Sequence, residues 1–211
     1  MRSDAAPLAM ARAFVLCFLL CLPAHASSSH GTGVAVSTTG SSALLSLAHV
    51  ELERYSRATV ATADGEAAAG PNSGRGTLAT PTLRLWVLDL SNLVDAEDAT
   101  EQLQQCIGAT PAELGLRPQE HVVHRCVEQS SIGEVRFVLA GGDHIGALYA
   151  AYYFVEHVFG VAFSIAGDRL PSPRTLADIL QHAQKLDSLG TVVSPRFALR
   201  GIQPFHDFRG E

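Results

Sequence analysis

The amino-acid sequence predicts an α+β fold, in which a mixed β-sheet carries two helices packed on one face. The chain contains several apolar runs of strand length, and two longer segments in which apolar residues recur at helical spacing. Along the chain these segments follow the order strand, helix, three strands, helix, strand. One sheet with both helices on the same side buries the apolar face of each element, so this arrangement satisfies the pattern.

The first half of the chain supplies two strands and one helix. A short strand is predicted over residues 34–36, and a helix over residues 41–57, where a serine can cap the first turn. Residues 58–80 are rich in Ala, Gly, Thr and Ser and have no apolar period, which predicts a disordered surface insertion. A strong strand follows over residues 82–90. The apolar face of the helix consists of Leu44, Leu47, Ala48, Leu52 and Tyr55.

The second half supplies the remaining elements. Residues 95–105 are polar and predict a surface helix or loop, and the runs at 121–127 and 134–140 predict a β-hairpin. The clearest helix covers residues 143–159, and Gly160 stands where a left-handed residue ends a helix. Residues 161–165 predict a further strand. The segment that follows is irregular up to residue 193, with a candidate helix over 176–186.

A glycine-rich loop between the strand at 134–140 and the long helix invites comparison with phosphate-binding loops. Its glycine spacing does not match a dinucleotide fingerprint, and no Gly-Lys-Ser/Thr follows. The structural interpretation is therefore preferred. Gly141 and Gly142 form the tight turn, Asp143 caps the helix, and Gly146 lets the helix lie close to the sheet.

His121 and His124 form a His-x-x-His pattern that could indicate a metal site. On a strand, however, residues three apart point to opposite faces, so this pair cannot chelate one ion. No carboxylate pair, Ser-His-Asp set or reactive cysteine stands out either. We therefore expect no metal and no cofactor, and no catalytic residue in this chain.

The N-terminus has the three parts of a secretory signal peptide. Arg2 and Arg12 precede an apolar run of ten residues, 13–22, and the sequence Ala24-His25-Ala26 supplies a cleavage site after residue 26. As a helix the run would rise only about 15 Å, too short for a hydrocarbon core of about 30 Å. We expect residues 1–26 to be removed, no stable membrane anchor, and a mature protein that is secreted or in the lumen of the secretory pathway.

Composition narrows the class of partner. The chain of 211 residues has a formal net charge of −6 and a single lysine, Lys185. Nucleic acids and anionic membranes call for clustered Lys and Arg, so this balance argues against both. Neutral partners such as sugars are compatible with it.

Two of the four cysteines, Cys17 and Cys21, lie in the predicted signal peptide. Cys106 and Cys126 would remain in the mature protein, where an oxidising compartment could pair them. They could equally be two buried thiols, because sequence separation does not show whether the two Cβ atoms approach each other. The sequence leaves both alternatives open.

The end of the chain predicts the beginning of a second domain. After a proline-bounded linker at 194–196, residues 197–202 form a short apolar strand, and a polar and aromatic cluster follows. Arg200 can donate paired hydrogen bonds to vicinal hydroxyls or a carboxylate. His206 and Asp207 stand just beyond the strand, where a (β/α)₈ barrel places its working residues. The alternative is that these side chains only anchor a linker.

Three stretches of the sequence resemble a known family. They are Val135-Arg-Phe-Val-Leu-Ala-Gly-Gly-Asp-His-Ile-Gly and its continuation to residue 161, then Gly167-Asp-Arg-Leu-Pro, then Pro195-Arg-Phe-Ala-Leu-Arg-Gly. Together they resemble the small α+β domain that precedes the catalytic barrel in family 20 β-N-acetylhexosaminidases and in α-glucuronidases. The resemblance implies that Arg200 would bind hydroxyls of the terminal sugar. After Gly201 the match ends, and the resemblance does not choose between the two groups of enzymes.

The resemblance implies three regions and one function. Residues 1–26 would be the signal peptide, 30–193 an accessory α+β domain, and 194–211 the start of a truncated catalytic barrel. The chain would then be the accessory domain of a secreted glycoside hydrolase acting on polysaccharides or glycans. It would be inactive alone, because the catalytic acids of these families lie later in the barrel, and carbohydrate would bind through the missing part.

The alternative class is a secreted, non-catalytic module that binds carbohydrate or protein. A flat platform of exposed aromatic residues would favour it. Trp86 is the only tryptophan, and it lies in a strand that is predicted to be buried.

Overall fold

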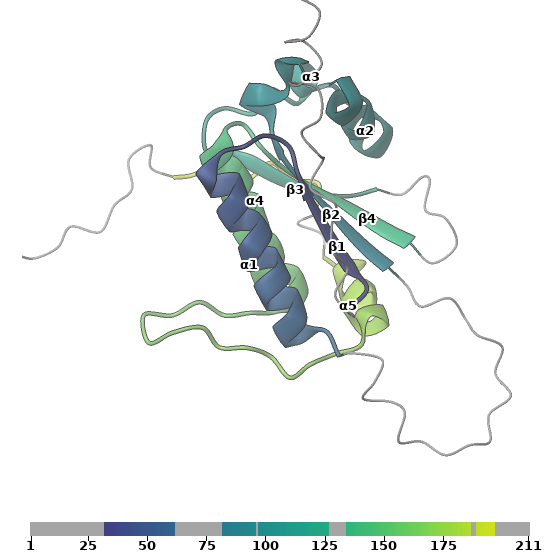
Figure 1. Ribbon diagram of the computed structural model, residues 1–211, viewed down its shortest axis with the longest axis vertical. Coiled ribbons are helices and arrows are strands. Elements are labelled where there is room, and N and C mark those ends of the chain that lie inside the picture. Colours follow the sequence, from purple (N-terminus) through teal and green to yellow (C-terminus); the bar gives the residue numbers. More distant parts are fainter. Residues whose placement is uncertain (1–31, 62–81, 96, 127–133, 187–188, 197–211) are drawn as a thin grey trace, which may run out of the picture.

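The computed structural model describes residues 32–61, 82–95, 97–126, 134–186 and 189–196. Its centre is a four-stranded sheet of β1 (Val34–Thr38), β2 (Thr82–Asp89), β3 (His121–Cys126) and β4 (Glu134–Gly141), in the order β1-β2-β4-β3 (Figure 1). The predicted signal peptide, most of the predicted insertion and the predicted barrel strand lie outside the described residues.

The sheet is mixed, as predicted. β1 pairs with β2 and β2 with β4 in parallel, whereas β3 pairs with β4 in the antiparallel direction. In the parallel part the register sets Val36, Leu85 and Phe137 side by side. Because side chains alternate along a strand, these three residues point to the same face of the sheet. The α+β class with a mixed sheet is therefore confirmed.

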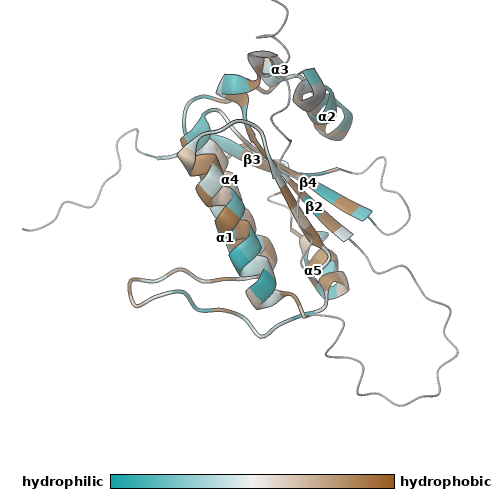
Figure 2. Cartoon of the chain, in the orientation of Figure 1, coloured by the Kyte–Doolittle hydropathy of each residue, from teal (hydrophilic) through white to brown (hydrophobic). Residues whose placement is uncertain are grey.

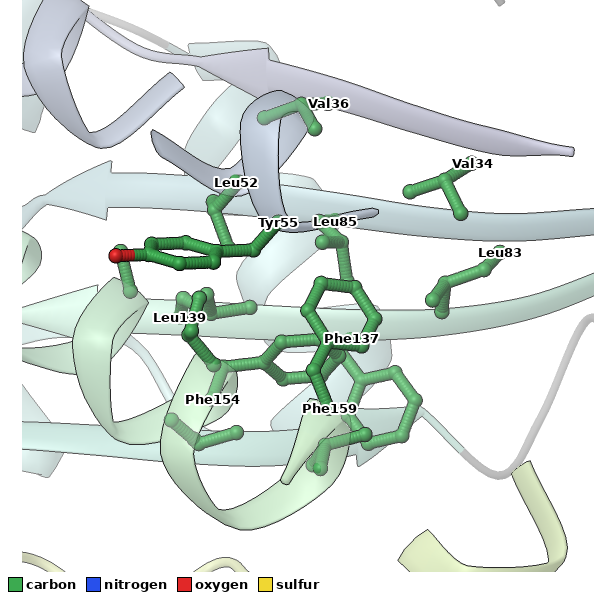
Figure 3. Packing of buried hydrophobic residues seen from close by; sticks show 14 of the residues in the cluster. Val34, Val36, Leu52, Tyr55, Leu83, Leu85, Phe137, Leu139, Phe154 and Phe159 are labelled. Carbon is green, nitrogen blue, oxygen red and sulfur yellow. The ribbon is translucent and has the colours of Figure 1, made fainter. Parts of the chain in front are cut away.

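Two helices cover this face, which confirms the predicted arrangement of the main layer. They are α1 (Ala43–Thr59) and α4 (His144–Phe154), and α4 continues into a π-helical turn, η3 (Val155–Phe159). Figure 2 shows the hydrophobic colours running along the strands that the helices cover. The buried rings meet edge-on, with centroids 5.2 Å apart for Phe137 and Phe154 and 5.1 Å apart for Phe154 and Phe159 (Figure 3).

The opposite face of the sheet is covered as well, which the sequence analysis did not predict. The 3₁₀ turn η2 (Leu90–Asp95), α2 (Glu97–Ile107) and α3 (Pro111–Leu114) follow β2 on that side. Leu103 of α2 is fully buried there against Val122 and Val138. The polar sequence of α2 predicted only a surface element, because a helix that buries one narrow stripe is mostly polar.

A disulfide bond joins Cys106 of α2 to Cys126 at the end of β3. It crosses the second face of the sheet, where Cys126 is buried. The sequence left this pairing open, since only the packing of α2 on β3 brings the two side chains together. The bond therefore fastens the second layer to the sheet.

The strand predicted at 161–165 is wrong. That segment makes one antiparallel bridge, between Ala162 and Arg169, and Ile165 at its tip is fully exposed. Ser164 and Gly167 close a turn between them, which reverses the chain before a strand can form. The edge of β3 is instead paired by the segment at 190–193, where the N–H groups of His121 and Val193 each donate to the other's carbonyl.

The predicted insertion begins later than expected. α1 runs to Thr59, and Val60 then forms a parallel bridge with Arg174. Thr59 and Val60 are therefore buried rather than exposed. The sequence pattern missed this because the partner strand segment lies over 110 residues away in the sequence. The candidate helix at 176–186 is confirmed as α5 (Leu176–Ala183), and Gly160 ends η3 with a φ of 80°, as predicted.

The glycine-rich loop has the structural role that the sequence predicted. A Cβ atom at Gly141 would overlap the backbone of Ala147, and one at Gly142 would overlap the carbonyl of Arg117. The Asp143 carboxylate accepts a hydrogen bond from the Gly146 N–H at 2.7 Å and so caps α4. Backbone of this chain thus occupies the space around the two glycines of the turn.

Candidate functional site

An open groove of about 460 Å³ lies beside α4. One wall is the outer side of α4, the second is the start of β3, and the third is the segment that leads out of the domain. We call it the tyrosine groove. It is lined by Gln119, His121, Tyr149, Tyr152, Tyr153 and Glu156, together with residues 193–196.

The spacing of residues along α4 explains why tyrosines line the groove. Small residues occupy the side of the helix that faces the sheet, and they are buried: Gly146, Ala147, Ala150 and Ala151. They let the helix approach the sheet closely. Residues three and four apart share a helix face, so Tyr149, Tyr152 and Glu156 project together on the outer side.

Contacts with neighbouring aromatic rings hold these tyrosines. The Tyr153 ring stacks on His157 with centroids 4.0 Å apart, and the His121 ring lies edge-on to Tyr153 at 5.6 Å. Tyr152 meets Phe163 edge-on at 5.4 Å. Such pairs add stability beyond the area that they bury. The groove wall is therefore ordered by packing.

Gln119 forms the end of the groove nearest the first turn of α4. Its backbone has a φ of 66°, in the left-handed region that L residues rarely adopt. The Gln119 N–H donates to the Asp143 carboxylate at 3.0 Å, which holds this conformation. The residue that caps α4 thus also fixes this side of the groove.

Glu120 anchors the segment through which the chain leaves the domain. Its carboxylate accepts hydrogen bonds from the backbone N–H of Arg117 at 2.8 Å, from the Arg117 guanidinium at 2.8 and 2.6 Å, and from the Ser194 hydroxyl at 2.8 Å. Glu120 itself is buried. The hydrogen bonds from Arg117 and Ser194 lower the pKa of the Glu120 carboxyl to about 2. Ser194 is therefore tied to the domain by a charged acceptor.

We expect Glu120→Gln to destabilise the domain near neutral pH by about 1–3 kcal/mol, the cost of losing charge-assisted hydrogen bonds at a buried acceptor. Because the folded-state pKa of about 2 lies below the unfolded value, the carboxylate stabilises the fold above pH 4.5 or so. That contribution is lost as the pH falls through the folded-state pKa. Urea unfolding at several pH values measures it.

The control for this prediction is Glu156→Gln, which changes an exposed carboxylate of the same groove. The difference in unfolding free energy between wild type and Glu120→Gln should shrink as the pH is lowered from 5 toward 2. An equal difference at every pH in that range would contradict the role given to the Glu120 carboxylate.

A second anchor holds the turn segment at 161–174 beside the groove. The Asp168 carboxylate accepts hydrogen bonds from the Tyr55 hydroxyl at 2.5 Å and from the Arg54 guanidinium at 2.7 Å. Burial raises the pKa of Tyr55 to about 12, so the phenol stays protonated and donates. Phe163 packs edge-on to the Tyr55 ring at 5.8 Å. This segment is thereby fixed against α1.

The two histidines of the His-x-x-His pattern lie apart, as expected from strand geometry. The ring of His121 contacts Tyr149 and Tyr153 of α4, on the side of the first core. His124 shares its face of β3 with Val122 and Cys126, which belong to the second core. Within the described ranges, the chain brings together no group of three or more His, Cys, Asp or Glu side chains that could hold a metal ion.

The side chains predicted to bind substrate, Arg200, His206 and Asp207, lie outside the described residues. The tyrosine groove was not predicted. A signal for it exists in the sequence, because α4 contains no Asp, Glu, Lys or Arg and has three tyrosines in five residues. The groove also depends on residues 193–196, whose position beside α4 no local pattern indicates.

The lining of the groove combines apolar ring faces with a few polar groups. Among its described lining residues, Glu156 is the only carboxylic acid, whereas most glycoside hydrolases place two carboxyl groups across the scissile bond. The tyrosine rings offer apolar faces, and Gln119, Glu156 and Arg196 offer polar groups at the margins. Such a surface can contact a sugar ring or another part of a protein.

The fold and the groove define the class of this domain: a small α+β unit with a mixed, open four-stranded sheet, layered on both faces. Comparison with family models, with curated proteins and with solved structures finds no match. No helix within the described ranges is long and apolar enough to cross a membrane.

Proposed function

We propose that this chain is the N-terminal accessory domain of a secreted glycoside hydrolase that acts on polysaccharides or glycans. The observation that carries the proposal is the anchored exit of the chain. Glu120 and the edge of β3 hold residues 190–194 in place, directly before the segment Pro195-Arg-Phe-Ala-Leu-Arg-Gly, which resembles the opening of a catalytic barrel. A domain that precedes a barrel needs such a defined exit.

The described residues also support an accessory role. The groove presents one carboxylic acid, so the chemistry of glycoside hydrolysis would come from residues that follow in the extended protein. Substrate contacts are proposed for Arg200, His206 and Asp207. In this proposal the small domain positions the start of the barrel and does not itself act on sugar.

Secretion is part of the same proposal. Residues 1–26 have the parts of a signal peptide. The disulfide between Cys106 and Cys126 supports passage through an oxidising compartment, because such bonds are rare in reducing ones.

A second candidate function is a non-catalytic module that binds carbohydrate. The observation that favours it is the tyrosine groove, whose three aromatic rings and polar margins resemble the composition of sugar-binding surfaces. In this alternative the groove itself would bind the ligand.

One set of measurements distinguishes the two candidates. We expect the protein beginning at Ser27 and ending at Glu211 to show no turnover of aryl glycosides, and a protein extended through the following barrel to hydrolyse them. In the extended protein, Arg200→Ala should lower kcat/KM by about 10- to 100-fold, because it removes charge-assisted hydrogen bonds to the sugar. The control is Arg84→Ala, which removes an exposed arginine of β2 on the face of the sheet that α2 covers.

The same 27–211 protein is titrated with cellohexaose and chitohexaose by calorimetry. Saturable binding that Tyr149→Ala abolishes, together with an inactive extended protein, would establish the second candidate instead. Turnover by the 27–211 protein itself, in proportion to its purity, would contradict the accessory role.

A further inference from the structure

The second layer covers only part of its face of the sheet. Side chains alternate along a strand, so Arg84 and Trp86 of β2 point to the same face as Leu88, which belongs to the second core. The Arg84 side chain is 52% exposed, and Trp86 is half-buried. α2 and α3 lie toward the other end of the strands (Figure 1), and hydrophilic colours mark the ends of β2 and β4 that lie away from them (Figure 2). Trp86 therefore stands at the edge of an open surface, although the sequence placed it in a buried strand.

Two arginines and one glutamate accompany this tryptophan. Arg84 of β2 lies directly beside Arg136 of β4 in the register of the two strands. The Glu134 carboxylate pairs with both, and its Oε1 atom lies 3.1 Å from Nε of Arg84 and also contacts Nε of Arg136. The guanidinium carbon of Arg136 lies 5.6 Å from the centre of the Trp86 ring, within the range of a cation–π interaction. We call these four residues the tryptophan cluster.

The charges of the tryptophan cluster do not cancel. Like charges on neighbouring strands repel each other, and the single carboxylate of Glu134 balances only one of the two guanidiniums, which leaves a local charge of +1. Both arginines reach Glu134 through Nε, and no described residue accepts a hydrogen bond from their terminal nitrogen atoms. This cationic surplus stands on a chain whose net charge is −6. An anionic group with several acceptor atoms would complement it.

The surroundings of the cluster favour a carboxylate that is carried on a sugar ring. A guanidinium can bind a carboxylate through two parallel hydrogen bonds. A pyranose ring has an apolar face of C–H groups that packs against the face of an aromatic side chain, and Trp86 provides such a face beside the arginines. On the β1 side, the neighbours of Arg84 and Trp86 in the register are the small residues Ala35 and Ser37, so the surface there is low. An acidic peptide would supply carboxylates but no rigid ring.

We propose that the tryptophan cluster binds a carboxylated polysaccharide, with the carboxylate of a uronic-acid residue on Arg84 and Arg136 and the sugar ring against Trp86. The inference rests on the proposed function for the class of ligand, a glycan, and adds an acidic group to it. The tyrosine groove lies beside α4, on the other side of the sheet, so the cluster is a separate site. Aryl glycosides without an acidic group do not engage the cluster. Turnover by the extended protein and binding at the cluster can therefore fail independently.

The test is titration of the 27–211 protein with hexagalacturonate, followed by tryptophan fluorescence and by calorimetry. Trp86 is the only tryptophan of the chain, so its emission reports directly on this site. We expect a saturable change in emission, and about tenfold weaker binding by Arg136→Gln, as for the loss of one charge-assisted hydrogen bond. Added salt should also weaken binding to the wild type, because it screens charges at the surface.

Arg57→Gln is the matched control. Arg57 also pairs with a glutamate, Glu53 at 2.8 Å, but it belongs to α1 on the other side of the sheet, so this variant should bind like the wild type. If circular dichroism shows that Arg136→Gln does not fold, the comparison is made with Arg84→Gln.

Three results would overturn the proposal. The first is the absence of both an emission change and a heat of binding, and the second is equal binding by Arg136→Gln and Arg57→Gln. The third is a neutral or peptide ligand that binds as tightly as hexagalacturonate. Cellohexaose would then show that the acid is not recognised, and hexaglutamate would assign the cluster to acidic peptides.

Discussion

Replacing Phe154 by alanine should lower the free energy of unfolding by about 3–5 kcal/mol, the usual cost of truncating a buried phenylalanine. Phe154 is fully buried at the end of α4, and its ring meets Phe137 of β4 and Phe159 of η3 edge-on (Figure 3). The substitution would leave a cavity between the sheet and the helix that forms the groove wall. Guanidinium unfolding measures the change from the midpoint and slope.

Phe163→Ala is the matched control. Phe163 also makes two edge-on ring contacts, with Tyr55 and Tyr152, but 39% of its surface is exposed. Solvent can fill the space that its removal leaves, so we expect a loss of less than about 1.5 kcal/mol. Equal effects of the two substitutions would mean that Phe154 does not lie in the core as described.

The second large effect is expected for the disulfide. The double variant Cys106→Ser/Cys126→Ser should unfold with a free energy about 3 kcal/mol smaller, because the bond closes a loop of 20 residues in the unfolded chain. The loss of stability should affect α2 first, because the bond secures the contact of α2 with β3. Thermal unfolding followed by circular dichroism measures it.

Reductant provides the control for this prediction. Dithiothreitol should lower the melting temperature of the wild type to that of the double variant and leave the variant unchanged. Intact mass after alkylation without reductant provides a second check. In the 27–211 protein, which has no other cysteines, two alkyl groups on the denatured wild type would mean that the thiols are unpaired and would contradict the bond.

Local pattern was sufficient for the elements of the first layer. The apolar period predicted α1, although the buried face of that helix contains Leu45 and not Leu47, which is exposed. The apolar runs of β2 and β4 and the helix that begins after Asp143 also depend on residues close in sequence. The sequence also predicted the steric requirements of single residues. Gly141 and Gly142 have no room for a side chain, and Asp143 has the local geometry of a cap.

The errors lie where distant segments meet. Residues 161–165 have the composition of a strand, yet β3 is paired at its edge by residues 190–193, which are less apolar. Thr59 and Val60 resemble the start of a loop, but Arg174 pairs with them and buries them. Hydrogen-bond partners of an edge strand come from any part of the chain, so composition does not determine which segment docks there.

Some features of the candidate site were likewise predictable from the sequence, and others depend on the folded chain. The three tyrosines of α4 and the lack of Asp, Glu, Lys and Arg within that helix are properties of the sequence. That the outer side of α4 becomes a groove depends on Glu120, which receives Arg117 from its own loop and Ser194 from 74 residues further along the chain. The class of elements and the chemistry of each helix follow from neighbouring residues, because period and capping are local. The second layer, the disulfide and the wall beside α4 exist only in the folded chain, because each joins residues that are far apart in sequence.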